Sequence, residues 1–309
     1  MSVQEPAIIS ASGRAGTASG RLSWASDPDG PKPLVVLIHG GGVNAKYFDN
    51  ELHSIPTDFN KRGYNVLNVN RIGYGGNPLP LTSTPLFDAI PTYLDLIAEA
   101  YSQQGGQGGI VIFGHSLGGV TALAIAAVNE VSAKQDGSQK LPLKGVSALG
   151  SVPSALAPSE ILSALASVEG DRLPINTNPT DEEKRRFLGT PEFFEETNLD
   201  KVLPALEQGV KNEYLEWLSG DAYERFVGEI APNIKIPLQY LAGEIELHWP
   251  DLPSAEPIFQ AAVALFGNAP SIDAGLLKGG AHNFEYSKSA HVLADRRFTW
   301  LESLLGISR

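Results

Sequence analysis

Residues 108–119 constrain the fold of this chain more than any other stretch. A β-branched run ends at Gly114, Ser116 follows two residues later, and Gly118 precedes a small, apolar run at 120–127. This pattern predicts a strand, a sharp turn and a helix, with the serine at the apex of the turn. The two glycines leave room where strand and helix approach closely, and the turn strains the serine backbone. We therefore expect the serine hydroxyl to be lifted off the sheet, where it can meet a base and a substrate carbonyl.

A second glycine-rich loop follows another predicted strand. Residues 33–38 form a continuous apolar run, typical of a strand buried on both faces, and lead directly into His39 and three glycines at 40–42. Either this loop is a flexible turn, or its backbone N–H groups approach a ligand with no side chain in the way. A developing oxyanion needs donors of this kind. We interpret His39 as structural and not as a base.

Strands and helices alternate through the first half of the chain and again near its end. Buried strands alternating with helices predict an α/β fold with a mostly parallel, doubly wound sheet and right-handed crossovers. Pro91 marks either the start of a helix or a kink in it. We expect strands at 7–9 and 20–24 (a hairpin), 33–38, 64–69, 110–113, 144–150, 236–243 and 271–277, and helices at 46–62, 84–103, 120–127, 254–266 and 290–305.

The alternation stops at Ser151. We expect no buried strand between 152 and 233, and helices at 159–168, 181–187, 191–197, 200–217 and 222–230. Residues 181–230 hold thirteen Asp or Glu against six Lys or Arg, which we interpret as a solvated acidic face. The prediction is an α/β core of residues 1–150 and 235–309, with an inserted helical cap, or lid, of residues 151–234.

Polar side chains follow four of the predicted strands where those strands end. They are His39 with its glycines, Ser116, Glu244 or Glu246, and His282. Ligands of open α/β sheets bind outside the carboxyl ends of the strands. A serine becomes a good nucleophile when an imidazole takes its proton and a carboxylate fixes the imidazole tautomer. The chain order is serine, acid, histidine.

With these motifs, the chain resembles the α/β-hydrolase superfamily over essentially its full length, as a capped serine hydrolase. The motifs are His-Gly-Gly-Gly at 39–42, Gly-His-Ser-Leu-Gly at 114–118 and Gly-Ala-His-Asn-Phe at 280–284. The resemblance implies a Ser-His-acid triad, no metal and no organic cofactor.

The resemblance also implies roles for single residues. Ser116 is the nucleophile, which argues against epoxide hydrolases and haloalkane dehalogenases, because those relatives use an aspartate there. One oxyanion N–H comes from Gly41 or Gly42, and the other comes from Leu117. Leu117 opens its helix, where the helix dipole favours negative charge.

The choice of base and acid is less direct. His282 is our predicted base, because His115 lies inside the elbow and His291 lies in the last helix; His248 also competes. Members of the superfamily often show Gly-x-x-Asp after the relevant strand. Glu246 fits that spacing from Gly243, so we predict it as the acid. The alternatives are Glu244 and, less favoured, Asp251.

Composition limits the possible partners. The net charge is -12, so an acidic surface would repel nucleic acid and anionic membranes. The chain has no Cys, its first residues do not resemble a signal peptide, and no apolar run approaches the roughly 20 residues that span a bilayer. We expect a cytoplasmic enzyme that acts on a small molecule; the oligomeric state stays open.

The leading functional prediction is hydrolysis of an ester, lactone or thioester of a bulky apolar molecule. The alternatives are a C–C bond hydrolase or lyase, a proline-iminopeptidase-like enzyme, and a non-catalytic ligand-binding protein on the same scaffold. Some aromatic side chains could line the site, although a core position is favoured for each of them: Tyr47, Phe48, Tyr74, Trp217, Trp249 and Phe284. Further apolar side chains of the predicted cap form its core or face the site: Leu162, Leu165, Phe187, Phe193, Phe194, Leu203, Leu206, Tyr214, Leu218 and Phe226.

Overall fold

Eight strands of the described residues form one sheet with helices on both sides. The computed structural model describes residues 5–25, 32–135, 140–151, 159–175, 180–246 and 253–306. The strands are β1 (Ala7–Gly13), β2 (Gly16–Ser23), β3 (Leu34–Ile38), β4 (Val66–Asn70), β5 (Ile110–His115), β6 (Leu143–Leu149), β7 (Arg172–Leu173), β8 (Gly209–Val210), β9 (Leu238–Gly243) and β10 (Ile272–Leu277). The α-helices are α1 (Ile55–Lys61), α2 (Pro85–Asp88), α3 (Ile90–Gln103), α4 (Leu117–Gln135), α5 (Ser159–Ser167), α6 (Asp181–Leu188), α7 (Leu199–Val202), α8 (Lys211–Trp217), α9 (Gly220–Arg225), α10 (Ala255–Ala264) and α11 (Ala290–Leu304).

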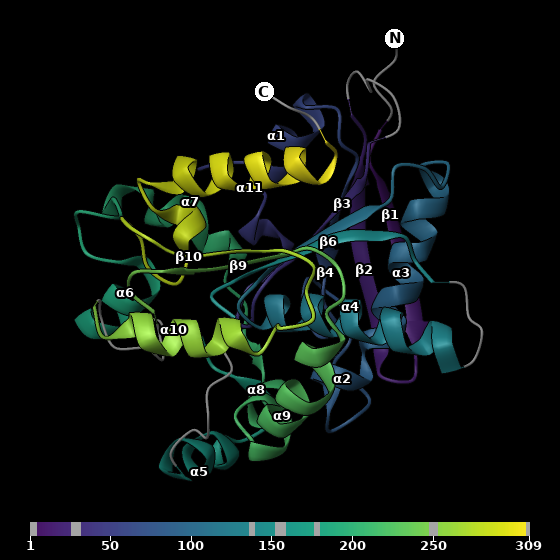
Figure 1. Ribbon diagram of the computed structural model, residues 1–309. Helices are drawn as coiled ribbons and strands as arrows, with labels where there is room; N and C mark the ends of the chain where they lie inside the picture. Colours follow the sequence, from purple (N-terminus) through teal and green to yellow (C-terminus); the bar gives the residue numbers. More distant parts are fainter. Residues whose placement is uncertain are drawn as a thin grey trace.

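The strand order of the large sheet is β1-β2-β4-β3-β5-β6-β9-β10 (Figure 1). The strands β1 and β2 form an antiparallel hairpin, and β2 also runs antiparallel to β4. All pairings from β4 to β10 are parallel. This sheet confirms the predicted α/β class with a mostly parallel, doubly wound sheet.

The two faces of the sheet carry separate hydrophobic clusters. Leu34, Val36 and Ile38 of β3 pack with residues of α3, α4 and α10, whereas Val35 and Leu37 pack with residues of α1 and α11. In Figure 1, α1 and α11 lie on one side of the sheet and α4 and α10 on the other. Because both faces are covered, every residue of β3, β5 and β9 is buried, which explains their continuous apolar runs.

The helix predicted over 46–62 is wrong as one element. The structure has a single 3-10 turn at Ala45–Tyr47 and then α1, which begins at Ile55. The side chain of Asn50 accepts hydrogen bonds from the N–H groups of Leu52 and His53, which makes a turn. Ser54 then caps a new helix, because its Oγ accepts from the N–H of Thr57 at 3.2 Å.

The helix predicted over 84–103 is also two helices. α2 ends at Asp88, and α3 begins at Ile90 with Pro91 in its first turn. Proline fits the first turn of a helix, because the N–H that it lacks has no partner there. The position of Pro91 therefore marks a helix start, one of the two outcomes predicted for it.

The segment between β6 and β9 departs from prediction in detail. No helix covers 191–197, where the structure has a turn and a 3-10 turn at Glu196–Asn198. The helix predicted over 200–217 is divided into α7, a 3-10 turn containing Pro204, the short strand β8, and α8. β8 is buried and pairs with β7 in a small antiparallel sheet, so the expectation of no buried strand was wrong. Proline and glycine interrupt the helical pattern here.

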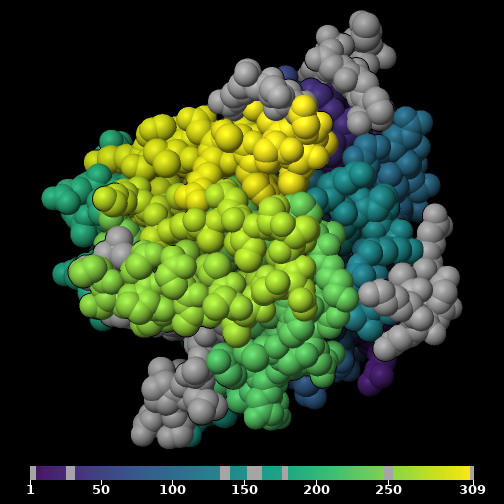
Figure 2. Space-filling view, in the orientation of Figure 1, coloured from purple at the N-terminus to yellow at the C-terminus, as the bar shows by residue number. Residues whose placement is uncertain are grey.

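The face of the molecule in Figure 2 is covered by helical segments. In this orientation α11 lies on one side of the sheet and α10 on the other, with the edge strand β10 between them. None of the helices in the described part of the chain is long and apolar enough to cross a membrane.

The start of α1 gives a test of the corrected helix boundary. Replacing Ser54→Ala removes the side-chain acceptor of the helix cap, so we expect the free energy of unfolding to fall by about 1 kcal/mol. Urea unfolding measures this loss. The matched control Ser102→Ala changes an exposed serine inside α3 and should leave stability unchanged or slightly higher. Equal stability of the two variants would contradict the boundary at Ser54.

Candidate active site

Ser116 lies between the last residue of β5 and the first residue of α4. Its φ is 54°, and among the described residues it is the only non-glycine with positive φ. A Cβ on Gly114 would lie 2.5 Å from the Cα of Gly119, and a Cβ on Gly118 would overlap the carbonyl oxygen of Ile38. Strand and helix therefore approach too closely for side chains at these two glycines, which is the geometry expected of a serine elbow.

Backbone contacts hold this strained turn in place. The N–H of Ser116 donates to the carbonyl of Leu149 at 2.8 Å, and its carbonyl accepts from the hydroxyl of Ser151 at 2.8 Å. A non-glycine residue in the left-handed region costs on the order of 1–3 kcal/mol, so such a conformation needs support from the surrounding structure. β6 and the residues after it supply that support.

Glu246 lies directly beside His282. Oε2 of Glu246 and Nδ1 of His282 are 2.5 Å apart, and both side chains are buried. The N–H of Gly243 donates to Oε1 of Glu246 at 3.1 Å. Burial opposes ionisation of Glu246, but His282 and the Gly243 N–H stabilise the carboxylate and bring its pKa below the ordinary value. With an ionised Glu246 accepting from Nδ1–H, the unprotonated nitrogen of a neutral His282 is Nε2.

Glu244, the alternative acid, has a different contact. Its Oε1 accepts from the N–H of Gly279 at 3.0 Å, three residues before His282 in the chain. It therefore supports the loop that carries the histidine and does not contact the imidazole. Of the other candidates, His291 lines a separate cavity between α1 and α11. His248, Trp249 and Asp251 lie outside the described residues.

His115 packs behind His282 and not over the serine hydroxyl. The two rings are 4.8 Å apart, and Nε2–H of His115 donates to the backbone carbonyl of His282 at 3.0 Å. Burial lowers the pKa of His115 to about 4, so its ring is neutral near pH 7. The opposite face of the ring stacks on Tyr47 at 4.5 Å. This histidine therefore positions the loop of His282.

The glycine loop lies against Ser116 and against the segment inserted after β6. A Cβ on Gly40 would lie 2.9 Å from the Cβ of Ser116. The carbonyl of Gly42 accepts from the N–H of Glu207 at 2.9 Å, so the loop is paired with the insertion. On the other side of the site, the N–H of His282 donates to the carbonyl of Arg186 in α6 at 3.2 Å. The insertion thus contacts the site on two sides.

His39 is buried and stabilises the glycine loop through hydrogen bonds, the structural role expected from the sequence. Its Nε2 accepts from the N–H of Arg71 at 3.2 Å, and its Nδ1 pairs with the carbonyl of Gly40 at 2.8 Å. Burial first, and then the charge of Arg71, hold the pKa of His39 well below its ordinary value. The ring is therefore neutral and bonded through both nitrogens, so it is not available as a base.

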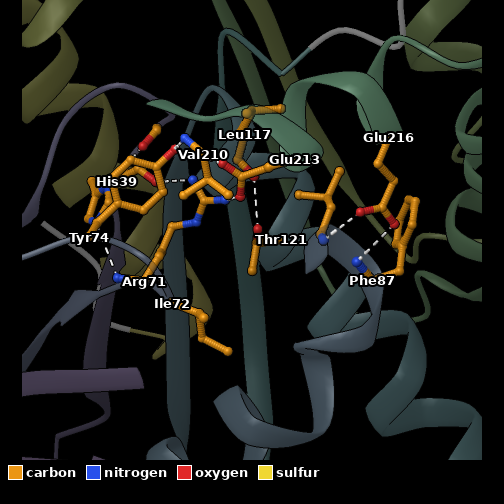
Figure 3. A network of polar contacts seen from close by, with 12 residues as sticks. His39, Arg71, Ile72, Tyr74, Phe87, Leu117, Thr121, Val210, Glu213 and Glu216 are labelled. Atoms are coloured by element: carbon orange, nitrogen blue, oxygen red, sulfur yellow. Dashed lines mark hydrogen bonds and ion pairs between the residues drawn. The ribbon is translucent and has the colours of Figure 1, made fainter. Parts of the chain in front are cut away.

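A buried ion pair fastens α8 to the core. Arg71, directly after β4, pairs with Glu213 of α8, and both side chains are almost fully buried (Figure 3). Glu213 also accepts from the hydroxyl of Tyr74 at 2.9 Å, and that hydroxyl accepts from the N–H of Val210 at 3.0 Å. A second glutamate of α8, Glu216, accepts from the N–H groups at the start of α2.

Several of these residues were missed by reasoning from sequence. Neither Arg71 nor Glu213 was among the site residues predicted from the sequence. An arginine directly after a buried strand could have indicated a buried ion pair at the end of the sheet. Glu285 and Arg297 form a second buried pair, with Tyr47 donating to Glu285 at 2.5 Å. The aromatic candidates in the described part of the chain are buried in the core, as the sequence favoured for each of them: Tyr47, Phe48, Tyr74, Trp217 and Phe284.

Comparison with known proteins identifies the family. The model of the Alpha/beta hydrolase family matches residues 35–295. The chain belongs to this family. No curated protein matches the chain significantly.

Solved structures share its fold at low sequence identity. A carboxyl esterase from Bacillus coagulans is 14% identical, with a TM-score of 0.64 and coverage of 97% of this chain and 99% of that chain. A thermophilic esterase from Thermogutta terrifontis is 16% identical, with a TM-score of 0.61 and coverage of 97% and 99%. A monoacylglycerol lipase from Paleococcus ferrophilus is 19% identical, with a TM-score of 0.59 and coverage of 97% and 100%.

The buried pair beneath His115 predicts acid sensitivity. Burial opposes the charge of Glu285, but Arg297, His115 and Tyr47 lower its pKa to about 2, against an ordinary value of 4.5. A lowered folded-state pKa contributes stability above about pH 4.5, and this contribution is lost as pH falls toward 2. We expect the free energy of unfolding of Glu285→Gln at pH 7 to be lower than that of the wild type by on the order of 3 kcal/mol.

Urea unfolding at a series of pH values measures this effect. The stability gap between wild type and Glu285→Gln should narrow between pH 4.5 and pH 2. The control Glu5→Gln changes an exposed glutamate and should show no such gap. A gap that stays constant with pH would contradict the assigned charge of Glu285.

The ion pair of Arg71 and Glu213 predicts non-additive losses. Glu213→Leu or Arg71→Met alone leaves an unpaired buried charge, so each should lower stability by about 3–5 kcal/mol. The double variant should lose clearly less than the sum of the single losses, as measured by a double-mutant cycle. The exposed pair Arg225–Glu229 is the control, and Glu229→Leu should change stability little. If the stability losses of the two single variants simply add in the double variant, the pairing of Arg71 with Glu213 is contradicted.

Proposed function

We propose that this protein is a serine hydrolase that cleaves an ester, lactone or thioester of a bulky apolar small molecule. The observation that carries the proposal is the 2.5 Å hydrogen bond between Glu246 and His282, in a chain whose predicted nucleophile Ser116 is held at φ 54° in a tight turn after β5. An acid, an imidazole and a strained serine that follow β9, β10 and β5 of one parallel sheet form the set of groups that acyl transfer needs. Esterases and a lipase among the similar structures support the choice of bond.

In the proposed mechanism, Nε2 of His282 takes the proton from the hydroxyl of Ser116. The serine oxygen attacks the substrate carbonyl, and His282 returns the proton to the leaving group, which gives an acyl-enzyme. A water molecule then loses a proton to His282 and attacks the acyl-enzyme, which releases the acid product and restores the hydroxyl of Ser116. Glu246 fixes the imidazole tautomer and stabilises the imidazolium. Ser116 makes no hydrogen bond through its hydroxyl to any described residue, and in free enzymes such catalytic contacts are often long.

The oxyanion of the intermediate needs donors that are already in position. We propose the N–H groups of Gly41 and Leu117. The first N–H groups of a helix have no partner within the helix, and the helix dipole adds to their effect. Gly42 is the weaker of the two glycine candidates, because its N–H is near the hydroxyl of Tyr74 and lowers the pKa of that tyrosine, against the larger effect of burial.

We further propose that residues 151–234 act as a cap over a core of residues 1–150 and 235–309. The backbone contacts of this segment to Gly42 and His282 support a position beside the site. Because the cap would close the site, its side chains would select the substrate. A small apolar substrate and a cytoplasmic location stay predictions from the sequence.

Ser116→Ala and Glu246→Gln test the triad. With para-nitrophenyl butyrate as the probe, Ser116→Ala should lower kcat by at least about 10⁴-fold, and Glu246→Gln by about 10³–10⁴-fold. Glu244→Gln is the matched control, because it carries the same change two residues away and should keep most of the activity. Circular dichroism confirms that each variant is folded.

The triad assignment fails in two cases. In the first, Ser116→Ala keeps wild-type turnover. In the second, Glu244→Gln loses as much activity as Glu246→Gln.

A further inference from the structure

Tyr214 of α8 carries a hydroxyl that the proposed mechanism does not use. A Cβ on Gly41 would lie 2.5 Å from its Oη, and a Cβ on Gly42 would lie 3.3 Å from the same atom. The same Cβ on Gly41 would lie 2.9 Å from Cδ1 of Leu117. The hydroxyl of Tyr214 therefore borders the loop of Gly41 and Gly42, at the point where the side chain of Leu117 also meets that loop.

This hydroxyl makes no hydrogen bond with the described residues, in contrast to its neighbour. The hydroxyl of Tyr74 donates to Glu213 at 2.9 Å and accepts from the N–H of Val210 at 3.0 Å, so its role is structural. The Tyr214 side chain is half-buried, so its hydroxyl is free to meet a molecule bound at the glycine loop. Beside a loop of backbone donors, a substrate atom is the partner that fits.

The proton of Tyr214 stays on its oxygen near neutral pH. Burial, with a further contribution from the neighbouring Tyr74, raises the pKa of Tyr214, and the charge of Arg71 only partly offsets this rise. A protonated phenol is a donor, and an oxyanion accepts from donors. The chemistry of the side chain therefore matches the charge that develops at the loop.

The position of Tyr214 is fixed from both ends of α8. Its preceding residue, Glu213, is held by the buried ion pair with Arg71. Two residues later, Glu216 accepts from the N–H of Leu86 at 2.6 Å, which ties the helix to α2 (Figure 3). A donor held in this way needs no rearrangement when the substrate becomes charged, and such preorganised donors contribute most to catalysis.

We propose that the Tyr214 hydroxyl donates a hydrogen bond to the substrate carbonyl oxygen as it becomes an oxyanion, together with the N–H groups of Gly41 and Leu117. This inference rests on the proposed serine-hydrolase function. The hydroxyl keeps its proton throughout, and no bond to Tyr214 forms or breaks. The segment inserted after β6 would thus take part in the chemistry as well as in the choice of substrate.

Tyr214→Phe tests the inference, because it removes one oxygen that bonds to no described residue and leaves no partner unpaired. With para-nitrophenyl butyrate we expect kcat to fall about 10²-fold, the size of one lost oxyanion donor, while KM stays nearly constant. Tyr223→Phe on α9 is the matched control and should keep wild-type kinetics. A Tyr214→Phe protein within about twofold of wild type would overturn the inference.

A pair of inhibitors separates oxyanion binding from a structural role. A long-chain alkyl trifluoromethyl ketone adds to a catalytic serine and forms an oxyanion, whereas the matching methyl ketone stays uncharged. Tyr214→Phe should weaken binding of the trifluoromethyl ketone by about the same factor by which it lowers kcat/KM. Binding of the methyl ketone should stay unchanged. If the variant binds both ketones more weakly by the same factor, Tyr214 acts through packing and the inference is overturned.

The proposed function can fail separately. If the wild-type protein shows no Ser116-dependent ester hydrolysis, the serine-hydrolase proposal fails and the role of Tyr214 falls with it. If the wild type hydrolyses the ester through Ser116 and Tyr214→Phe does so equally well, only the role of Tyr214 is wrong.

Discussion

The close approach of β5 and α4 at Ser116 is the constraint on which the rest of the site depends. A side chain on Gly114 would overlap α4, and a side chain on Gly118 would overlap the end of β3. Between these two glycines, Ser116 is held in the left-handed region. The turn sets the serine at the sheet edge where the glycine loop, β6 and the loop of His282 also end. Every other contact of the site, from the carbonyl of Leu149 to the ring of His115, is arranged around this turn.

Buried charge connects the inserted segment to this edge. Arg71 follows β4 and pairs with Glu213, so a helix far along the chain is fixed beside the glycine loop. On the opposite side, Glu285 and Arg297 form a second buried pair behind the histidines. Buried pairs contribute little net stability over apolar packing, but removing one partner is costly. The first pair joins α8 to the end of β4, and the second joins the loop after His282 to α11.

The parts of this structure that the sequence could predict are those with strong local patterns. The apolar run of β3 and the glycines at 114 and 118 determine a strand and a turn through short-range sterics, and the alternation of strands and helices predicts a mostly parallel sheet. Spacing favoured Glu246 over Glu244 as the acid but left Glu244 as an alternative, because the contacts of both side chains depend on how the loops after β9 and β10 meet. Tyr214 and the pairing of Arg71 with Glu213 depend on contacts between distant segments, which no local pattern encodes.

The central claim is that Ser116 is an activated nucleophile. Intact-protein mass spectrometry after treatment with an alkyl fluorophosphonate tests it most directly, because such probes react with a serine that a neighbouring base activates. The account predicts one added phosphonyl group, located on Ser116 by peptide mapping, and much slower labelling of His282→Ala. A folded protein that takes no label, or takes it at another residue, would contradict the account.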